Sequence, residues 1–357
     1  MFIAIVGTRG SGKSTVEDYL VAKGFTPVRL TWKDLELPMT TDAKTADVNI
    51  SGVLEKQPSC SFLNMHSPIS PTFSPGRSIP LIFASPGHLL EHVTENWLTN
   101  FVTVDLASVP LVNHFAKRPF FMLVNIDAPL LQRYRRLQGP VSLSLEEFVR
   151  QDDECVFGAN TCPPNHEQGQ RGLRGIIPLV KLNIINAFQS ISELHCHLDS
   201  LDMASTERLR PRWDTYFMTL ADLASQRSNC MKRRVGAILV RENRIVATGY
   251  NGTPRGVTNC NEGGCARCNR TSTTDDAECL CLHAEENALL EAGRDRVGSN
   301  AILFCNTCPC LKCTIKIIQS GVKTVVYNLS YKVDDASAKL FQEAGVKVRR
   351  HVPPTVP

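Results

Sequence analysis

Hydrophobic positions near the N-terminus form one uninterrupted run and then change period. Residues 2–7, FIAIVG, read as a buried strand, TRGSG as a glycine-rich turn, and residues 13–24 as a helix. Apolar strands resume over 80–85, 101–107 and 119–129, with room for a helix between each pair. Strands that alternate with helices favour a parallel sheet with crossover helices.

The remainder of this first half is mostly helical or polar. Residues 129–138, 144–154 and 186–201 have helical spacing, and residues 158–172 form a polar loop. Residues 38–80 lose periodicity and include the serine- and proline-rich stretch HSPISPTFSPGRSIP. That composition is typical of a linker, so we expect a partly disordered insertion there.

The pattern begins afresh near Arg210. A helix over 213–228 is followed by strands over 235–243 and 244–251 in hairpin order, and then by a loop rich in cysteine and glycine that extends to residue 281. The remaining segments alternate: helix 283–293, strand 301–306, helix 309–321, strand 323–328, helix 334–345 and strand 346–350. We therefore predict two α/β domains, over 1–205 and 206–350.

Composition narrows the class of protein. A chain of 357 residues with 43% hydrophobic and 21% charged residues is ordinary for a soluble two-domain protein. A net charge of +4 is too weak to indicate duplex nucleic acid, although it suits an anionic small molecule. The sequence shows neither a membrane-spanning apolar run nor a signal peptide. We expect a cytoplasmic protein, with the nucleus as a second location, without a membrane or a stable nucleic-acid partner.

Cysteines are concentrated in the second half. Ten of the fourteen lie between Cys230 and Cys313. In a reducing compartment such a cluster is better explained by metal binding or catalysis than by disulfides.

Two short motifs in this half carry metal-binding residues. His283 and Glu285 stand at the start of a predicted helix, while Cys310 and Cys313 follow Pro309 at the start of another. Residues three apart share a helix face, so both thiols can reach one ion. One histidine and two cysteines leave a fourth zinc position open for water, as catalytic sites do. A chance HxE beside a structural CxxC is the alternative, and Cys305 and Cys308 are rival ligands.

Glu285 has a separate predicted role. Zinc lowers the pKa of water toward neutrality, and a neighbouring carboxylate can take the water proton and deliver it to a substrate nitrogen. Helix N-termini also favour thiolates, which helps both cysteines to bind as anions. Glu285 is therefore the candidate catalytic residue.

The combination HAE followed by PCLKC resembles the signature of zinc nucleobase deaminases. Within that superfamily, SQRSNCMKRRVGAILV, GYNGTPRG and HAEENAL resemble deoxycytidylate deaminases, and the cysteine-rich loop looks like the fungal form. The resemblance covers about 213–350 and implies a cytidine-deaminase-like α/β/α domain. It implies conversion of dCMP to dUMP and ammonia, supplying dTTP synthesis, by a homo-oligomer that dCTP activates and dTTP inhibits. It also implies that zinc-activated water attacks C4 of cytosine while Glu285 carries protons to N3 and to the departing amine.

The same resemblance suggests substrate contacts. Asn251 would contact the sugar or phosphate of the nucleotide, and the backbone of Ala284 would help to read the base. Basic residues near the predicted site suit a phosphate, and Arg233 is our candidate among Arg227, Lys232, Arg233, Arg234 and Arg255. Each of these could equally be a solvated surface charge.

The other cysteines of the loop raise the question of a second zinc. Six are available: Cys230, Cys260, Cys265, Cys268, Cys279 and Cys281. Four of them could form a closed structural site that pins the loop. Some relatives carry a second zinc in this region, with Cys230, Cys260 and Cys281 at matching positions. Our preferred set adds Cys268 to these three, and free buried thiols are the alternative.

A phosphate-binding motif lies at the other end of the chain. GTRGSGKS, from Gly7 through Gly12 to Ser14, fits the P-loop pattern between a strand and a helix. Its backbone N–H groups would face phosphates, Lys13 would contact the β- and γ-phosphates of ATP, and Ser14 would hold Mg²⁺.

The segment FFMLVNIDAPLLQRYRR and the closing helix resemble nucleoside-monophosphate and dephospho-coenzyme A kinases, with Arg133 or Arg136 in a lid-like region. This implies a three-layer P-loop kinase-like α/β domain. The Ser/Pro insertion departs from that family, and Asp105 is the available acidic residue after an apolar strand.

Four functions follow from these features. The first is a zinc-dependent dCMP deaminase whose P-loop domain is regulatory or vestigial, and the second is a bifunctional enzyme with an active nucleotide kinase. A nucleic-acid-editing deaminase shares the zinc signature but lacks an aromatic and basic stripe here. A purely structural zinc module would leave Glu285 unexplained.

Overall fold

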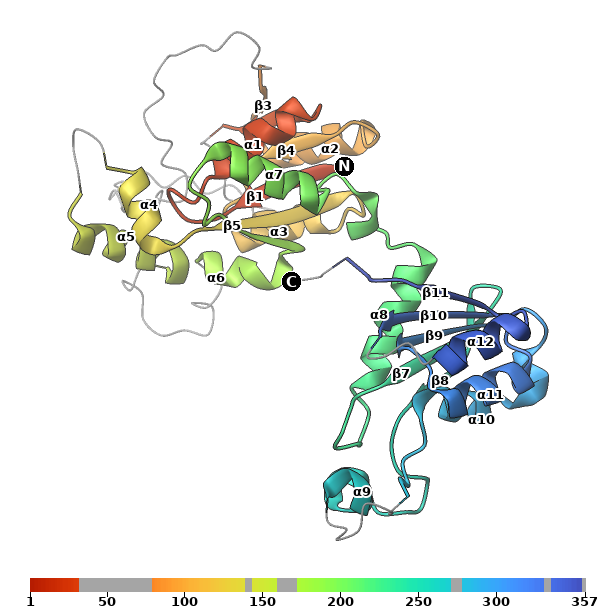
Figure 1. Cartoon of the computed structure of the whole chain (residues 1–357). Coiled ribbons are helices and arrows are strands. Elements are labelled where there is room, and N and C mark those ends of the chain that lie inside the picture. The colour runs from red at the N-terminus through yellow and green to blue at the C-terminus, as the bar shows by residue number, and fades with distance from the viewer. Residues whose placement is uncertain (32–78, 139–142, 159–171, 271–277, 331–334, 355–357) are drawn as a thin grey trace, which may run out of the picture. The chain divides into compact units, whose positions relative to one another are not determined.

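The computed structural model describes residues 1–31, 79–138, 143–158, 172–270, 278–330 and 335–354. Two compact units make up the fold, Met1–Arg210 and Pro211–Thr355, and each is described by itself (Figure 1). The insertion predicted over 38–80 lies almost entirely outside the described residues, as does most of the polar loop over 158–172.

The first unit is built on a parallel sheet of six described strands in the order β3-β2-β4-β1-β5-β6. Its strands are β1 (Phe2–Val6), β2 (Thr26–Leu30), β3 (Leu81–Phe83), β4 (Phe101–Thr103), β5 (Phe121–Asp127) and β6 (Leu182–Ile185). The predicted parallel sheet is confirmed. The strands β2 and β6 were not predicted, because a proline and an arginine interrupt TPVRL, and LNII is too short to show a period.

Helices cover both faces of this sheet. They are α1 (Lys13–Ala22), α2 (Pro86–Glu95), α3 (Val109–Ala116), α4 (Leu130–Arg136), α5 (Leu145–Phe157), α6 (Leu173–Ile176) and α7 (Ile191–Leu201). Side chains from α1 and α7 pack with Ile3 and Ile5, whereas those from α2, α3 and α6 pack on the opposite face with Phe2 and Ala4. Because β1 is buried on both faces, its sequence is a continuous apolar run.

One predicted helix begins later than expected. We predicted a helix from residue 186, but α7 begins at Ile191. Ser190 and Glu193 form a capping box there, in which each side chain accepts a hydrogen bond from the other's backbone N–H. The residues before Ser190 therefore form a loop, and the Asn186 side chain donates a hydrogen bond to the Ser11 carbonyl.

The second unit contains a mixed sheet of five described strands in the order β11-β10-β9-β7-β8. Its elements are α8 (Trp213–Ser225), β7 (Gly236–Arg241), β8 (Arg244–Tyr250), α9 (Ala266–Asn269), α10 (Ala284–Val297), β9 (Ile302–Thr307), α11 (Leu311–Ser320), β10 (Thr324–Leu329), α12 (Asp335–Glu343) and β11 (Lys347–Arg350). The strand β7 pairs antiparallel with β8 and β9, and β9, β10 and β11 run parallel. Glu242 and Asn243 form the hairpin turn with positive φ angles of 53° and 58°.

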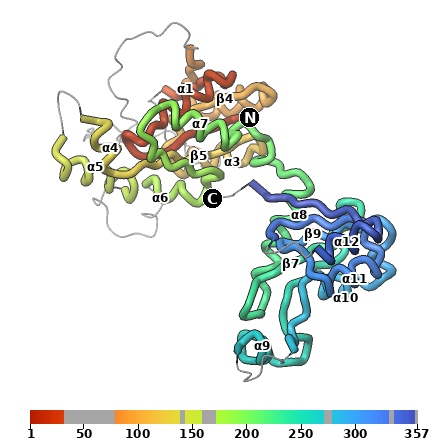
Figure 2. The backbone as a smooth tube through the Cα atoms, in the orientation of Figure 1, coloured from red at the N-terminus to blue at the C-terminus, as the bar shows by residue number. Residues whose placement is uncertain are grey.

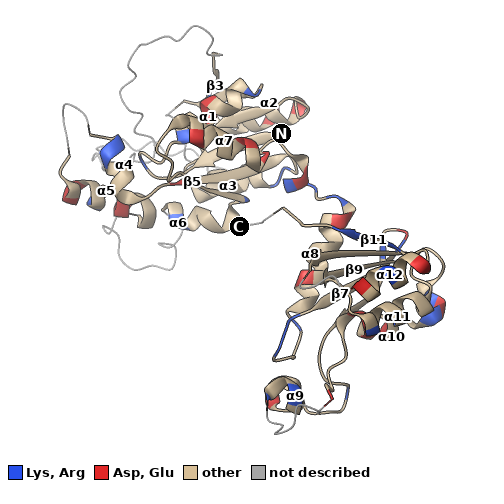
Figure 3. Cartoon of the chain, in the orientation of Figure 1, with Lys and Arg blue, Asp and Glu red and all other residues tan. Residues whose placement is uncertain are grey.

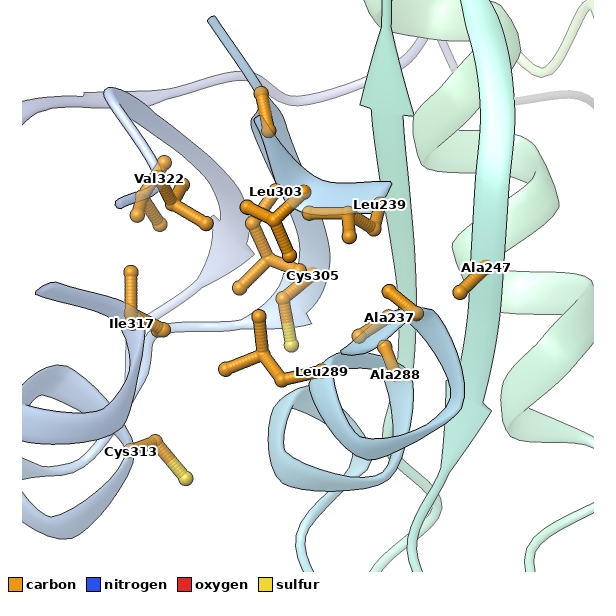
Figure 4. Packing of buried hydrophobic residues seen from close by; sticks show 14 of the residues in the cluster. Ala237, Leu239, Ala247, Ala288, Leu289, Leu303, Cys305, Cys313, Ile317 and Val322 are labelled. Atoms are coloured by element: carbon orange, nitrogen blue, oxygen red, sulfur yellow. The ribbon is translucent and has the colours of Figure 1, made fainter. Parts of the chain in front are cut away.

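This sheet also has a helix layer on each face. Phe217 and Met218 of α8 pack with Ile238 and Phe304 on one face. The other face packs against α10, α11 and α12, where Leu289 lies over the sheet near Cys305 (Figure 4). Within the described residues, no helix has the length and apolar character that a bilayer crossing requires.

Candidate active site

The histidine and carboxylate of the first motif lie where α10 begins. His283 is the N-cap residue, with extended backbone, and Glu285 is the second residue of the helix. The Glu285 side chain is buried at 4% exposure, while His283 reaches solvent. The helix bends at Gly293, where φ is 65° and ψ is 157°. The helix predicted over 283–293 therefore ends at this bend, and one further turn follows it up to Val297.

The second motif meets the first. Cys310 is the N-cap residue of α11 and Cys313 lies in its first turn. His283 Nδ1 is 3.2 Å from Cys313 Sγ and 3.4 Å from Cys310 Sγ, and the ligand atoms of all three residues lie within 4.8 Å of one another. Cys313 is buried and Cys310 partly exposed, so the group opens toward solvent on its histidine side.

These donors fit a zinc ion. With Zn–S near 2.3 Å and Zn–N near 2.0 Å, ligand atoms of a tetrahedral site stand roughly 3.5 to 3.8 Å apart. The two N···S separations are within a few tenths of an ångström of that. Cys305 is instead completely buried in the apolar core beside Leu289 (Figure 4), and neither it nor Cys308 belongs to the three-residue group.

The electrostatics of the group favour a cation. Hydrogen bonds from Cys313 and His283 lower the pKa of Cys310 to about 3, and the bond with Cys310 raises the pKa of Cys313 and of His283. The two thiols thus share a proton that a divalent ion can replace. Burial raises the pKa of the Glu285 carboxyl, which makes it a stronger base than an exposed glutamate.

Contacts between elements hold the two helix starts together. Glu286, next to the catalytic candidate, forms an ion pair with Lys316 of α11. Gly249 of β8 lies directly against α10, because a Cβ there would stand 2.1 Å from the Ala284 carbonyl oxygen. We did not predict a role for Gly249, although glycine inside a strand pattern signals close backbone approach.

The predicted substrate residues are near the site but already have structural contacts. Asn251 is buried, its Oδ1 accepts from the Val235 N–H at 2.8 Å, and its Nδ2 donates to the Arg233 carbonyl at 2.9 Å. It therefore anchors the segment before β7. That segment carries Lys232, Arg233 and Arg234 consecutively, and all three are exposed. The loop that leads into β7 is accordingly blue in Figure 3. Contact of Asn251, Arg233 or the Ala284 backbone with a nucleotide stays a prediction.

The loop cysteines form a buried cluster to which Cys268 of α9 belongs. The lobe that includes α9 lies at the end of the second unit away from β11 (Figures 1 and 2). The preferred four, Cys230, Cys260, Cys268 and Cys281, have their sulfur atoms within 4.8 Å of one another. A second group satisfies the same criterion: Cys265, Cys268, Cys279 and Cys281. The structure thus brings together the predicted set and adds a set that we did not predict.

The glycine-rich loop of the first unit lies at the carboxyl edge of β1, next to the centre of its sheet. Gly12 has a φ of 106° and immediately precedes α1. Lys13 Nζ donates to the carbonyls of Gly7 at 2.7 Å and Thr8 at 2.9 Å, and Asn186 Nδ2 donates to the Ser11 carbonyl at 2.8 Å. The Ser14 side chain is exposed.

Charged side chains around this loop have hydrogen-bond partners within the first unit. Burial lowers the pKa of Lys13 to about 8. Arg133 forms a bidentate pair with Asp152 of α5, whereas Arg136 donates to the Gly10 carbonyl at 3.3 Å. Asp105 accepts a hydrogen bond from the Leu30 N–H at 2.8 Å, so this carboxylate helps to hold β2.

Comparisons with known proteins concern both units. Residues 211–329 match the family described as the cytidine and deoxycytidylate deaminase zinc-binding region. The chain is 48% identical over 283 residues to the deoxycytidylate deaminase of Schizosaccharomyces pombe, over 78% of this chain and 85% of that protein. It is 45% identical over 278 residues to the deoxycytidylate deaminase of Saccharomyces cerevisiae, over 74% of this chain and 86% of that protein.

One solved structure is similar over part of the chain. The dCMP deaminase of cyanophage S-TIM5, solved in complex with dCMP and dUMP, is 37% identical, with 40% of this chain and 98% of that chain covered and a TM-score of 0.33. The two yeast matches are longer than Pro211–Thr355 and therefore extend into the first unit.

Proposed function

The chain belongs to the deoxycytidylate deaminase family of zinc-dependent hydrolases, and we propose that it converts dCMP and water to dUMP and ammonia. The observation that carries this proposal is the convergence of His283, Cys310 and Cys313 beside a buried glutamate. A structural zinc module would need no carboxylate there.

Each residue of the group has one task. His283, Cys310 and Cys313 would hold the zinc ion and leave one position open toward solvent. When bound, zinc supplies Lewis acidity that brings the pKa of water close to neutrality. Burial of Glu285 raises the pKa of its carboxyl, so that it can accept the water proton and later release it.

Proton transfer by Glu285 completes the reaction. Its carboxyl takes a proton from the attacking water and delivers one to N3 of cytosine as the new C4–O bond forms. It then moves the second water proton to the exocyclic amine, the C4–N bond breaks, and ammonia leaves. Glu285 ends in its starting state, so the overall balance is that of hydrolysis.

The substrate is a mononucleotide with a free phosphate. Lys232, Arg233 and Arg234 have exposed cationic side chains, and the Arg233 carbonyl accepts a hydrogen bond from Asn251. Arg233 is our candidate for the phosphate. Asn251 and the Ala284 backbone complete the proposed contacts with sugar and base. As family properties, we further expect a homo-oligomer that dCTP activates and dTTP inhibits.

A substrate panel tests this assignment. Zinc-loaded protein is incubated with dCMP, deoxycytidine, dCTP and single-stranded DNA, and ammonia release is followed. Turnover of dCMP supports the proposal, whereas turnover of DNA alone would identify a nucleic-acid-editing enzyme. Absence of dCMP turnover, with and without dCTP, would refute the deaminase assignment.

Two variants separate catalysis from metal binding. Glu285→Gln keeps the shape of the side chain but cannot accept a proton, so it should lose activity and retain zinc. His283→Ala removes a ligand and should lose the catalytic zinc, as measured by metal analysis. An active Glu285→Gln enzyme would show that another group carries the proton.

For the first unit we propose nucleotide binding through Gly7, Gly12, Lys13 and Ser14. The supporting observation is the buried Lys13 ammonium at the N-terminus of α1, where backbone N–H groups and the helix dipole favour a phosphate. ATP with Mg²⁺ is the expected ligand, and a regulatory role is the first possibility. An active nucleotide kinase is the alternative, and ATP consumption that disappears in Lys13→Ala would support it.

For the cysteine-rich lobe we propose a structural zinc held by Cys230, Cys260, Cys268 and Cys281. Their four sulfur atoms have the separation that one zinc ion requires. This site would tie the segment before β7 to the residues that precede α10.

A further inference from the structure

The six cysteines of the lobe can hold more than one ion. Its buried cluster consists of Cys260, Cys265, Cys268 and Cys281, with Cys230 packed against them. A short lobe with thiols as its buried cluster lacks the apolar area that ordinarily stabilises a fold. Metal ligation is the usual substitute, because binding energy then serves as folding energy.

Two groups of four sulfur atoms meet the distance requirement for one ion, and they overlap. Both contain Cys268 and Cys281, and each adds two further cysteines of its own. Cys268 Sγ lies 3.8 Å from Cys230 Sγ in the first group and 3.5 Å from Cys279 Sγ in the second. The shared pair is itself 3.9 Å apart. Cys268 thus lies between the two groups.

We propose that the lobe binds two zinc ions as a binuclear cluster of six thiolates, in which Cys268 and Cys281 bridge the ions. This extends the single structural zinc proposed above. Two tetrahedral ions need about eight ligand positions, and four terminal thiolates with two bridging ones supply them. Cys230 and Cys260 complete one ion, and Cys265 and Cys279 complete the other.

The distances favour ions over other states of these cysteines. A zinc tetrathiolate with Zn–S near 2.3 Å has sulfur atoms about 3.8 Å apart, and four of the sulfur–sulfur separations in the lobe range from 3.5 to 3.9 Å. A disulfide needs about 2.05 Å. A single ion in the first group would leave Cys265 completely buried without a ligand role.

Charge and hydrogen bonding suit such a cluster. Six thiolates and two zinc ions carry a net charge of about −2. Lys232, Arg267 and Arg270 are exposed and adjacent or close in sequence to ligands, so they supply compensating charge. The Met231 N–H also donates to Cys260 Sγ at 3.4 Å, and such donors stabilise thiolates.

The cluster would position the catalytic motif. Cys281 stands two residues before His283, and the intervening Leu282 forms a backbone bridge with Gly252. Both ions would therefore hold the strand-like segment that leads into α10. The bridging ligand Cys268 joins this segment to α9, and the terminal ligand Cys230 joins it to the segment before β7.

Native mass spectrometry of the full chain tests the metal count. We expect three zinc ions per chain, one at His283 and two in the lobe; two ions per chain would overturn the binuclear proposal. The double variants Cys230→Ser/Cys260→Ser and Cys265→Ser/Cys279→Ser should each lose at least one ion. Exposed Cys196→Ser in the first unit is the matched control and should keep three.

Cadmium-113 NMR of the substituted full chain tests the bridges without any mutation. Two lobe resonances split by mutual coupling are expected, and uncoupled resonances would overturn the bridging assignment. The result is independent of the deaminase proposal. His283→Ala should lower the count by one without removing the coupled pair, and dCMP turnover is measured separately.

Discussion

Replacing Gly249 by alanine should displace the start of α10, although Gly249 is not one of the predicted zinc-binding or substrate-binding residues. The added Cβ would stand 2.1 Å from the Ala284 carbonyl oxygen and 2.5 Å from the Ala288 nitrogen. Real Cβ atoms essentially never approach closer than 3.0 Å, so β8 and α10 must separate by about 1 Å. Both obstacles are helix backbone, which cannot rotate away as a side chain could.

The magnitude follows from this displacement. Overpacking of this kind costs about 1 to 3 kcal/mol of unfolding free energy. In a unit of this size each kcal/mol lowers Tm by about 2 to 4 °C. Because His283 and Glu285 flank Ala284, the helix start moves with it, and a shift of about 1 Å can lower kcat about 100-fold.

The assay combines thermal unfolding with steady-state turnover of dCMP at saturating zinc. Gly87→Ala is the matched control, since its Cβ would meet only Ser85 Oγ at 3.8 Å. The control should keep its kcat, and its Tm should not fall, because alanine favours a helix more than glycine does. If Gly249→Ala also keeps both, the close packing of β8 on α10 does not determine the geometry of the site.

The other predictions concern the buried amide of Asn251 and the partly buried Lys13. Asn251→Ala should cost about 1 to 3 kcal/mol in chemical denaturation because it leaves the Val235 N–H without its acceptor; Asn251→Asp, which keeps an acceptor, should cost less, and equal losses would contradict this reasoning. Since burial lowers the pKa of Lys13 to about 8, ATP affinity by calorimetry should fall about tenfold from pH 7 to 9 as the ammonium is lost. Lys13→Arg stays charged and should show no such fall, and a flat wild-type profile would refute the assignment. Because the folded pKa of Lys13 lies below its unfolded value of 10.5, the unfolded chain binds more protons between these values, and stability should rise with pH there.

Local patterns predicted the elements that carry the chemistry. The start of α10 at the histidine and the start of α11 behind Pro309 depend on short-range helix signals, which the sequence displays directly. Pairs such as Cys310 and Cys313 share a helix face whatever the rest of the chain does. The parallel sheet of the first unit was equally visible from its alternating strands and helices.

Elements whose sequence departs from an ideal pattern were missed. The strand β2 contains Arg29, whose charge hid the apolar run. In the structure Arg29 pairs with buried Glu17 of α1, at 2.5 and 2.6 Å. This pairing compensates the charge, but it joins residues on different elements, so the period of neither element reveals it.

Residue types and spacings were enough to identify His283, Cys310 and Cys313 as residues that could bind a metal. Packing of the second unit, which no spacing shows, brings the two motifs together and turns Asn251 toward backbone groups. It also decided that six loop cysteines form two overlapping groups instead of one chosen set. The physical reason is that spacing within a helix follows from backbone geometry, whereas contacts across a long loop depend on how the whole unit packs.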